Sequence, residues 1–315
     1  MRIIGKTGRE DIAIVYLAET MEGRFVEFVE SVQPPTSRNE KWVLIVSSLL
    51  GCPVNCLFCD AGGWYNGKLS KEEILEQIDY MITSRFPGKK IPVKKLKIQF
   101  ARVGEPSFNP NVLDVLEELP KLYDAPGILP CISTVAPKGN EKFFERLLTI
   151  KERFYRNGRF QLQFSLHSTD ENIRDRLIPV NKWSFKEIAA YGKRFNKEGE
   201  RKITLNFALN KEAPVDPNVL LDFFDPEKFL IKITPVNPTV KAAENKIESL
   251  IKSHPTKYAK KLIDELKKIG YEVIVSIGEL EENKIGSNCG MYIQRFLKEK
   301  RKIKDAYEYK IASIQ

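Results

Sequence analysis

The chain has 315 residues, a hydrophobic fraction of 42%, a charged fraction of 30% and a formal net charge of +9. This length suits one barrel-sized domain with appendages, and no apolar run approaches the roughly 18 residues that a membrane span needs. The first ten residues are polar and charged, which is not the pattern of a secretory signal. We therefore expect a cytoplasmic, monomeric protein without a membrane partner.

The first predicted element is a β-hairpin, with strands at residues 12–17 and 25–32 and a turn at 21–24. From residue 42 onward, apolar runs of strand length alternate with segments of helical period. A capping box, Ser70 with Glu73, marks the start of the first helix. The strands that follow the hairpin are expected at residues 42–46, 96–100, 128–133, 160–166, 203–209 and 229–234, and the later helices at 111–122, 141–150, 184–195 and 218–224.

Six strand–helix pairs in a row imply parallel strands joined by right-handed crossovers. Because six pairs are too few for a closed eight-stranded barrel, we expect an α/β fold with a partial (β/α)6 barrel at residues 41–240. A short β cap at residues 1–40 precedes the barrel. An α/β extension at 241–315 follows it, with a helix at 256–269, a strand at 271–277, a polar loop at 278–290 and a basic tail.

The positive charge is concentrated at residues 89–97 and 295–304. Basic surfaces bind polyanions through counterion release, so RNA is a candidate partner. The alternative is an ordinary solvated surface, since acidic residues are interspersed in both halves of the chain.

Three of the five cysteines lie on one short stretch, with the spacing Cys52-x3-Cys56-x2-Cys59. The odd total argues against a disulfide framework and for a reducing compartment. A cubane iron–sulfur cluster normally takes four thiolates, so three would leave one iron open for a ligand. A closed zinc site is the alternative, but it needs four ligands, and residues 1–130 contain no further cysteine or histidine.

The stretch from Gly51 to Cys59, with Phe58 directly before the last cysteine, resembles the signature of the radical S-adenosylmethionine (SAM) superfamily. The resemblance implies that the three cysteines hold a [4Fe-4S] cluster whose open iron binds SAM. It also implies reductive cleavage of SAM to methionine and a 5′-deoxyadenosyl radical, with electrons from a reductant such as flavodoxin or ferredoxin.

Further motifs occur in the order found in the RlmN/Cfr group, the radical SAM methyltransferases of adenine in large-subunit rRNA. This resemblance covers roughly residues 25–292. No single motif after the cysteine stretch is decisive, but their joint order is. The motifs are Val29–Val32, Gly104–Pro106 with Asn109, Ser133–Thr134, Ser165–His167 with Arg174–Asp175, Ile178–Asn181, Pro235–Pro238 and Asn288–Gly290.

The resemblance implies a role for each matching residue. Glu30 would be the proton-handling carboxylate, and Cys289 would accept a methyl group from one SAM. A radical from a second SAM would then take a hydrogen atom from that methyl group, and the resulting methylene radical would add to an sp2 carbon. The SAM site would be lined by Phe58, Gly104, Glu105, Ser133, Ser165, Leu166, His167 and Asn237.

Cys289 also has support that is independent of the resemblance. It lies in a loop rich in glycine, serine and asparagine, and loops of this kind often present reactive groups. A thiolate is a good methyl acceptor. The alternative is a loop cysteine without a function.

Two features depart from the family pattern. The family has a resolving cysteine seven residues before its first cluster cysteine, where this chain has Ile45. We expect Cys131 to be a buried packing residue rather than a replacement for that cysteine.

The second departure is the short segment before Glu30, where the family has an RNA-binding extension. A nucleotide, tRNA, peptide or metabolite therefore stays open as substrate. A radical SAM enzyme with a non-methylating reaction and a non-enzymatic metal-bearing RNA-binding protein are the alternative functions.

Overall fold

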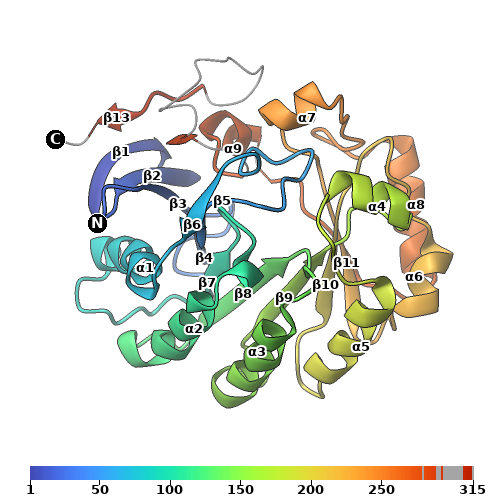
Figure 1. Cartoon of the computed structure of the whole chain (residues 1–315), viewed down its shortest axis with the longest axis horizontal. Helices are drawn as coiled ribbons and strands as arrows, with labels where there is room; N and C mark the ends of the chain where they lie inside the picture. Colours follow the sequence, from blue (N-terminus) through green and yellow to red (C-terminus); the bar gives the residue numbers. More distant parts are fainter. Residues whose placement is uncertain (279, 289–291, 294–307, 314–315) are drawn as a thin grey trace.

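A computed structural model of the chain describes residues 1–278, 280–288, 292–293 and 308–313. An eleven-stranded sheet forms the frame of this part of the chain, in the order β12-β11-β10-β9-β8-β7-β4-β3-β2-β1-β13 (Figure 1). The parallel strands are β4 (Trp42–Val46), β7 (Leu96–Phe100), β8 (Ile128–Thr134), β9 (Gln161–Ser165), β10 (Ile203–Ala208), β11 (Phe229–Thr234) and β12 (Val273–Val275).

The predicted α/β partial barrel is confirmed, with one more parallel strand than the six expected. Strand β12 pairs with β11 in parallel, with Val273 opposite Ile231. The sequence predicts a strand here but does not assign it to the barrel. In the structure it is only three residues long. Among the described strands, β12 and β13 are the two free edges of an open sheet.

Helices line the outer side of the parallel strands (Figure 1). The Ser70 capping box forms as predicted, since Ser70 Oγ accepts from the Glu73 amide and the Glu73 carboxylate accepts from the Ser70 amide. No helix within the described ranges is both long and apolar enough to cross a membrane. The helices are α1 (Lys71–Arg85), α2 (Asn111–Leu122), α3 (Glu141–Phe154), α4 (Glu171–Leu177), α5 (Phe185–Phe195), α6 (Pro217–Phe223), α7 (Val240–Glu244), α8 (Lys257–Lys268) and α9 (Leu280–Ile285).

The two faces of the barrel strands differ in polarity. In β7, Leu96, Ile98 and Phe100 are fully buried in the core beneath the helices. The residues between them, Lys97 and Gln99, point to the inner side because side chains alternate along a strand. The interior of this barrel is therefore polar rather than filled with apolar side chains, which leaves room for a ligand.

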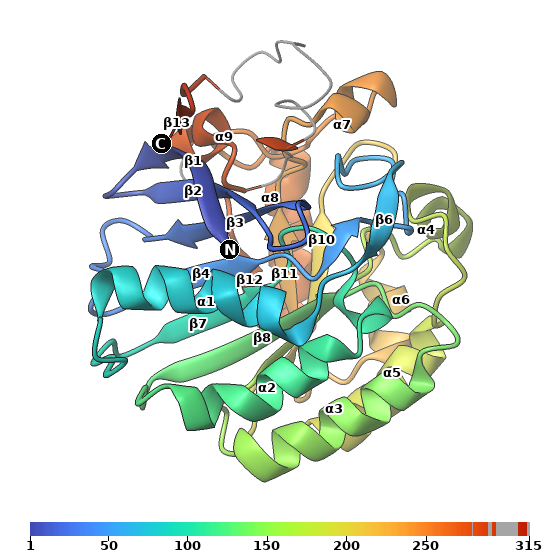
Figure 2. The same ribbon diagram turned by 60° about the vertical axis from the view of Figure 1, so that its left-hand side comes forward.

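The N-terminal strands extend the same sheet instead of forming a separate layer (Figure 2). They are β1 (Arg2–Arg9), β2 (Ala13–Glu19) and β3 (Phe25–Ser31), and β3 pairs antiparallel with β4. The predicted hairpin is confirmed as the β2–β3 pair. A smaller sheet contains β5 (Leu49–Gly51) and β6 (Tyr65–Lys68), and β13 (Ala312–Ser313) pairs with β1. The domain limits at residues 40 and 240 stay a prediction.

The C-terminal extension packs on the N-terminal strands. Ile285, Tyr292 and Ile293 share an apolar cluster with Val15 and Val29. The predicted polar loop at 278–290 is wrong in part, because residues 280–285 form α9. This helix is short, and burial of Ile285 against the sheet stabilises it more than local propensity does. Cys289 and residues 295–304 of the basic tail lie outside the described residues.

Candidate active site

The three cysteines predicted to bind the cluster lie together on the loop that follows β4 and β5. Cys52, Cys56 and Cys59 are all half-buried. The Cys59 amide donates to the Cys56 carbonyl over 3.2 Å, and Cys52 forms a β-bridge with Gly62. The loop is therefore folded back on itself rather than extended.

The charges of the neighbouring cysteines affect the pKa of Cys56. Burial raises the pKa of the Cys56 thiol well above its usual value, and the neighbouring Cys59 and Cys52 raise it further. Burial also raises the pKa of Cys52 to about 11, against the opposing effect of the Val54 and Glu105 backbone amides. Thiolates are the ligand form, so these residues must release protons when they bind a metal centre.

The donor set matches that of an iron–sulfur cluster. A cubane normally takes four thiolates, and three leave one iron open for a ligand. Cys52, Cys56 and Cys59 supply three cysteine side chains from one compact loop. Within the described residues, no group of three His, Cys, Asp or Glu side chains is arranged to hold a single metal ion.

The segment that follows β11 holds the outer part of the cysteine loop. Thr239 Oγ1 donates to the Phe58 carbonyl over 2.9 Å. The Asp60 carboxylate accepts from the Val240 and Lys241 amides, each over 3.0 Å, at the first turn of α7. The sequence analysis did not single out Asp60 or Thr239, although Asp60 directly follows the last cysteine.

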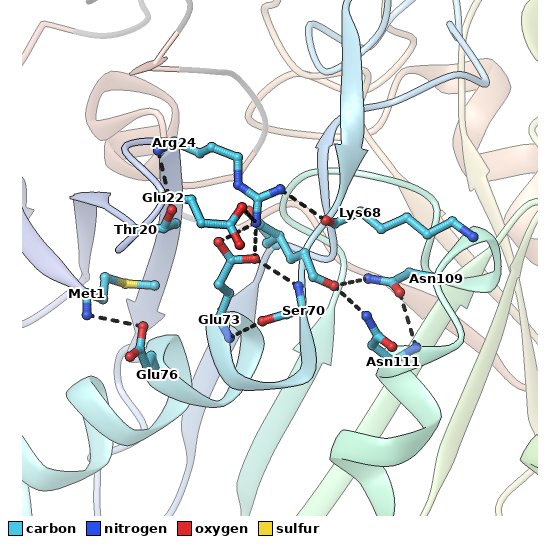
Figure 3. Close-up of polar contacts among 12 residues, drawn as sticks. Met1, Thr20, Glu22, Arg24, Lys68, Ser70, Glu73, Glu76, Asn109 and Asn111 are labelled. Atoms are coloured by element: carbon cyan, nitrogen blue, oxygen red, sulfur yellow. Dashed lines mark hydrogen bonds and ion pairs between the residues drawn. The ribbon is translucent and has the colours of Figure 1, made fainter.

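Asn109 fixes the two ends of the cysteine segment. Its buried Nδ2 donates to the Ser48 carbonyl over 2.7 Å and to the Leu69 carbonyl over 2.8 Å. Asn111 also donates to Leu69 (Figure 3). The glycine–glutamate–proline motif that precedes Asn109 is thus tied to the entry and exit of the loop.

A cavity of about 350 Å³ opens inside the barrel beside this loop. Its lining includes Ile45, at the position of the family's resolving cysteine. Ser133 Oγ and Asn206 Oδ1 are buried in this wall without a hydrogen-bond partner, so they are available to a ligand. Six of the residues predicted to line the SAM site are in the wall: Phe58, Gly104, Ser133, Ser165, His167 and Asn237.

The structure does not bring the side chains of Glu105 and Leu166 to this cavity. Leu166 is fully buried in the core beneath the helices. The Glu105 carboxylate accepts hydrogen bonds from Thr134 Oγ1 (2.5 Å), the Val135 amide (2.9 Å) and Ser107. Its pKa is raised by burial, which outweighs these bonds. Glu105 therefore holds the β7 and β8 loops in place, while its backbone amide faces Cys52.

Glu30 lies on the face of β3 away from the cavity. Its neighbour Ser31 is in the cavity wall, so alternation points Glu30 to the opposite side. There its carboxylate accepts from Tyr16 Oη over 2.6 Å, from Trp42 Nε1 over 3.0 Å and from Arg85 over 2.7 Å. These contacts favour a structural role for Glu30. The acidic residue in the cavity wall is Glu282, which the sequence analysis missed.

His167 is a neutral hydrogen-bond partner at the end of β9. Its Nδ1 accepts from the Ala208 amide over 3.0 Å, which places the ring proton on Nε2. The Phe58 ring packs edge-to-face against it, with centroids 4.8 Å apart. Burial, followed by the charge of Arg174, lowers the pKa of His167 to about 3.

We expect His167 to make the protein less stable as the pH falls from 7 to 5. The unfolded chain binds a proton below about pH 6.5, whereas the native ring stays neutral down to about pH 3. This difference lowers the free energy of unfolding by about 2 kcal/mol at pH 5. In urea unfolding, His167→Asn should lose less free energy of unfolding between pH 7 and pH 5, because asparagine does not titrate. Its Oδ1 can replace Nδ1 as the acceptor for the Ala208 amide. Equal losses of unfolding free energy in both proteins would contradict the assignment of the pH effect to His167.

A buried ion pair holds the segments on both sides of Cys289. Arg102 contacts Glu27 over 2.8 Å and donates to the Gly286 (2.9 Å) and Ser287 (2.8 Å) carbonyls. Glu27 in turn accepts from the Ile293 amide over 3.0 Å. Burial raises the pKa of Glu27, and the Arg102 guanidinium opposes that rise.

The chain is similar to RlmN proteins over most of its length, although no protein-family model matches it. It is 25% identical over 312 residues to the dual-specificity RNA methyltransferase RlmN of Wolinella succinogenes, which covers 95% of this chain and 82% of that protein. It is 26% identical over 292 residues to the probable dual-specificity RNA methyltransferase RlmN of Petrotoga mobilis, covering 90% and 76%. Its fold resembles that of a radical SAM methyltransferase from Sphaerobacter thermophilus, with a TM-score of 0.69, 20% identity and coverage of 92% and 81%.

The partial barrel and the three-cysteine loop define a radical SAM enzyme, whose cofactors are SAM and a [4Fe-4S] cluster. Such an enzyme also needs a reductant. Within this class the chain is an RlmN/Cfr-like radical SAM methyltransferase.

Proposed function

We propose that the enzyme methylates an sp2 carbon of an adenine, in RNA or in a nucleotide-like substrate, with Cys289 as the methyl carrier. The carbonyls of Gly286 and Ser287 are held by Arg102, and Asn288, directly before Cys289, lines the cavity beside Phe58 and Gly104. This placement of Asn288 is the observation that supports the proposal most strongly. The two RlmN relatives, both named as RNA methyltransferases, support RNA as the substrate, and the family resemblance implies adenine as the base.

Each group of residues has a role in this proposal. Cys52, Cys56 and Cys59 bind the cluster, and the polar wall with Ser133 and His167 orients SAM. When bound, these cofactors supply a methyl group and a carbon-centred radical. We further propose a cytoplasmic monomer that receives electrons from a flavodoxin or ferredoxin.

Release of the product must differ from the family scheme. Ile45 faces the cavity where the family has its resolving cysteine, and the remaining described cysteine, Cys131, is fully buried in β8. Ile45 has no thiol, and the complete burial of Cys131 favours a packing role over that of a resolving cysteine. A thiol from solution is the simplest replacement.

The test is an anaerobic reaction of the reconstituted protein with dithionite and SAM. We expect both S-adenosylhomocysteine and 5′-deoxyadenosine, and a methyl group on the Cys289 peptide by mass spectrometry. Cys289→Ala should lose the first product. If the wild-type protein forms neither S-adenosylhomocysteine nor methylated Cys289 but still makes 5′-deoxyadenosine, the chain is a radical SAM enzyme with a non-methylating reaction, as the Ile45 position would allow.

A further inference from the structure

Four lysines lie at the inner side of the partial barrel. Lys97 in β7 and Lys232 in β11 are on the inner face, and Lys41 and Lys95 directly precede β4 and β7. All four residues are half-buried. We call Lys41, Lys95, Lys97 and Lys232 the lysine group.

The members of the lysine group face one another across the barrel. Three strands separate β7 from β11 in the sheet, yet the charge of Lys97 lowers the pKa of Lys232, after the larger effect of burial, to about 8. Burial and then the charges of Lys95, Lys97 and Lys232 lower the pKa of Lys41 to about 8 as well. The curvature of the sheet therefore gathers these cations into one region.

No carboxylate in the described part of the chain pairs with these lysines, although the Cys131 thiol lies near Lys95 and Lys232. Lys95, Lys97 and Lys232 make no ion pair there, and Lys41 donates to the uncharged Gln33 amide. The exposed Lys94, by contrast, pairs with Glu40 over 2.7 Å. Clustered, half-buried cations without acids repel one another and are costly to hold in a folded protein.

The lysine group adjoins the cavity of the candidate active site. Lys232 is part of the cavity wall, next to Gln99, Gln163 and Asn206. Asn206 is 8% exposed, and its Oδ1 has no hydrogen-bond partner. The cavity thus runs from the cysteine loop, at the carboxyl ends of the strands, toward cations nearer their amino ends. This arrangement suits a small molecule with an anionic end.

The position of the lysine group inside the barrel distinguishes between two kinds of substrate. An adenine within an RNA strand would enter the cavity base first and leave its phosphates at the surface. Cations inside the barrel instead require an anion that enters together with the reacting group. Lysines bind phosphate as point charges and do not need the planar geometry of arginine.

We propose that the lysine group binds the phosphate of a mononucleotide whose base is directed toward the cysteine loop. This inference rests on the proposed function, because it takes the methyl acceptor to be a nucleobase. It narrows the substrate from RNA or nucleotide to a free 5′-phosphorylated nucleotide.

The experiment is calorimetric titration of the full-length, reconstituted protein in the presence of SAM. The ligands are AMP, GMP, CMP and UMP, the matching nucleosides, inorganic phosphate and a short adenine-containing RNA. At least one mononucleotide should bind about tenfold or more tightly than its nucleoside, as expected for charge-assisted contacts. Lys97→Gln and Lys232→Gln should each weaken that binding by about tenfold. Lys90→Gln, which removes an exposed lysine, should not.

Thermal unfolding of the unliganded variants separates binding from misfolding. Lys232→Gln should unfold at the same temperature as the wild type or a higher one, because it relieves repulsion. The inference is overturned if no mononucleotide binds better than its nucleoside, if phosphate alone binds as tightly, or if the RNA binds best and Lys232→Gln leaves its affinity unchanged. Methylation of Cys289 needs no nucleotide, so it tests the proposed function separately.

Discussion

Cys56→Ser should abolish SAM cleavage, while Cys131→Ser should retain most of it. Cys56 is one of three clustered thiols, and a cubane left with two protein ligands is not held stably. Cys131 is a buried packing residue in β8, and serine replaces it at nearly constant volume. The measurements are iron and sulfide per chain after reconstitution, and 5′-deoxyadenosine formed with dithionite and SAM.

The comparison of these two cysteines also controls for folding. Both variants should keep the circular dichroism spectrum of the apoprotein, since both replace sulfur by oxygen in a half-buried or buried position. Full iron content and SAM cleavage in Cys56→Ser, or their loss in Cys131→Ser alone, would move the metal centre away from the Cys52–Cys59 loop.

Arg102→Met should stop methylation of Cys289 and destabilise the protein by about 3–5 kcal/mol. The side chains of Arg102 and Glu27 are 2% and 0% exposed, so the substitution leaves an unpaired carboxylate in the interior. It also leaves the Gly286 and Ser287 carbonyls without their donor. Denaturant unfolding measures the loss of stability, and mass spectrometry of the Cys289 peptide measures the loss of methylation.

A double variant distinguishes positioning from stability. Glu27→Leu with Arg102→Met removes both charges and should recover much of the lost stability, because no buried charge stays unpaired. Methylation should stay low, since the Cys289 segment has still lost its anchors, whereas 5′-deoxyadenosine should form at close to the wild-type rate. Recovery of methylation along with stability would show that the ion pair acts on folding alone.

The fold was largely predictable because its core elements are local patterns with clear ends. The bounds of β4, β7, β11 and α2 agree with the sequence prediction to the residue. Strand β1 was missed, since its residues are mostly polar and it is stabilised by pairing with β2. Helices α4 and α7 were missed for a related reason: each is short and depends on contacts with the loops around it.

The candidate site was predictable only where a motif marks it. The cysteines and the ends of β8 and β9 follow from sequence order, whereas Glu27 and Arg102 are far apart in the chain and meet only in the fold. Strand alternation would have indicated the polar inner face of β7, with Lys97 and Gln99 between apolar residues. The orientation of Glu30 follows from the register of β3 with β4, which the sequence does not give.

The central claim is that the Cys52–Cys59 loop holds a cluster with one iron open to SAM. Electron paramagnetic resonance of the reduced, reconstituted protein, recorded with and without SAM, tests it most directly. We expect a [4Fe-4S] signal that changes when SAM is added. Absence of that signal, or a cluster signal that SAM leaves unchanged, would contradict the claim.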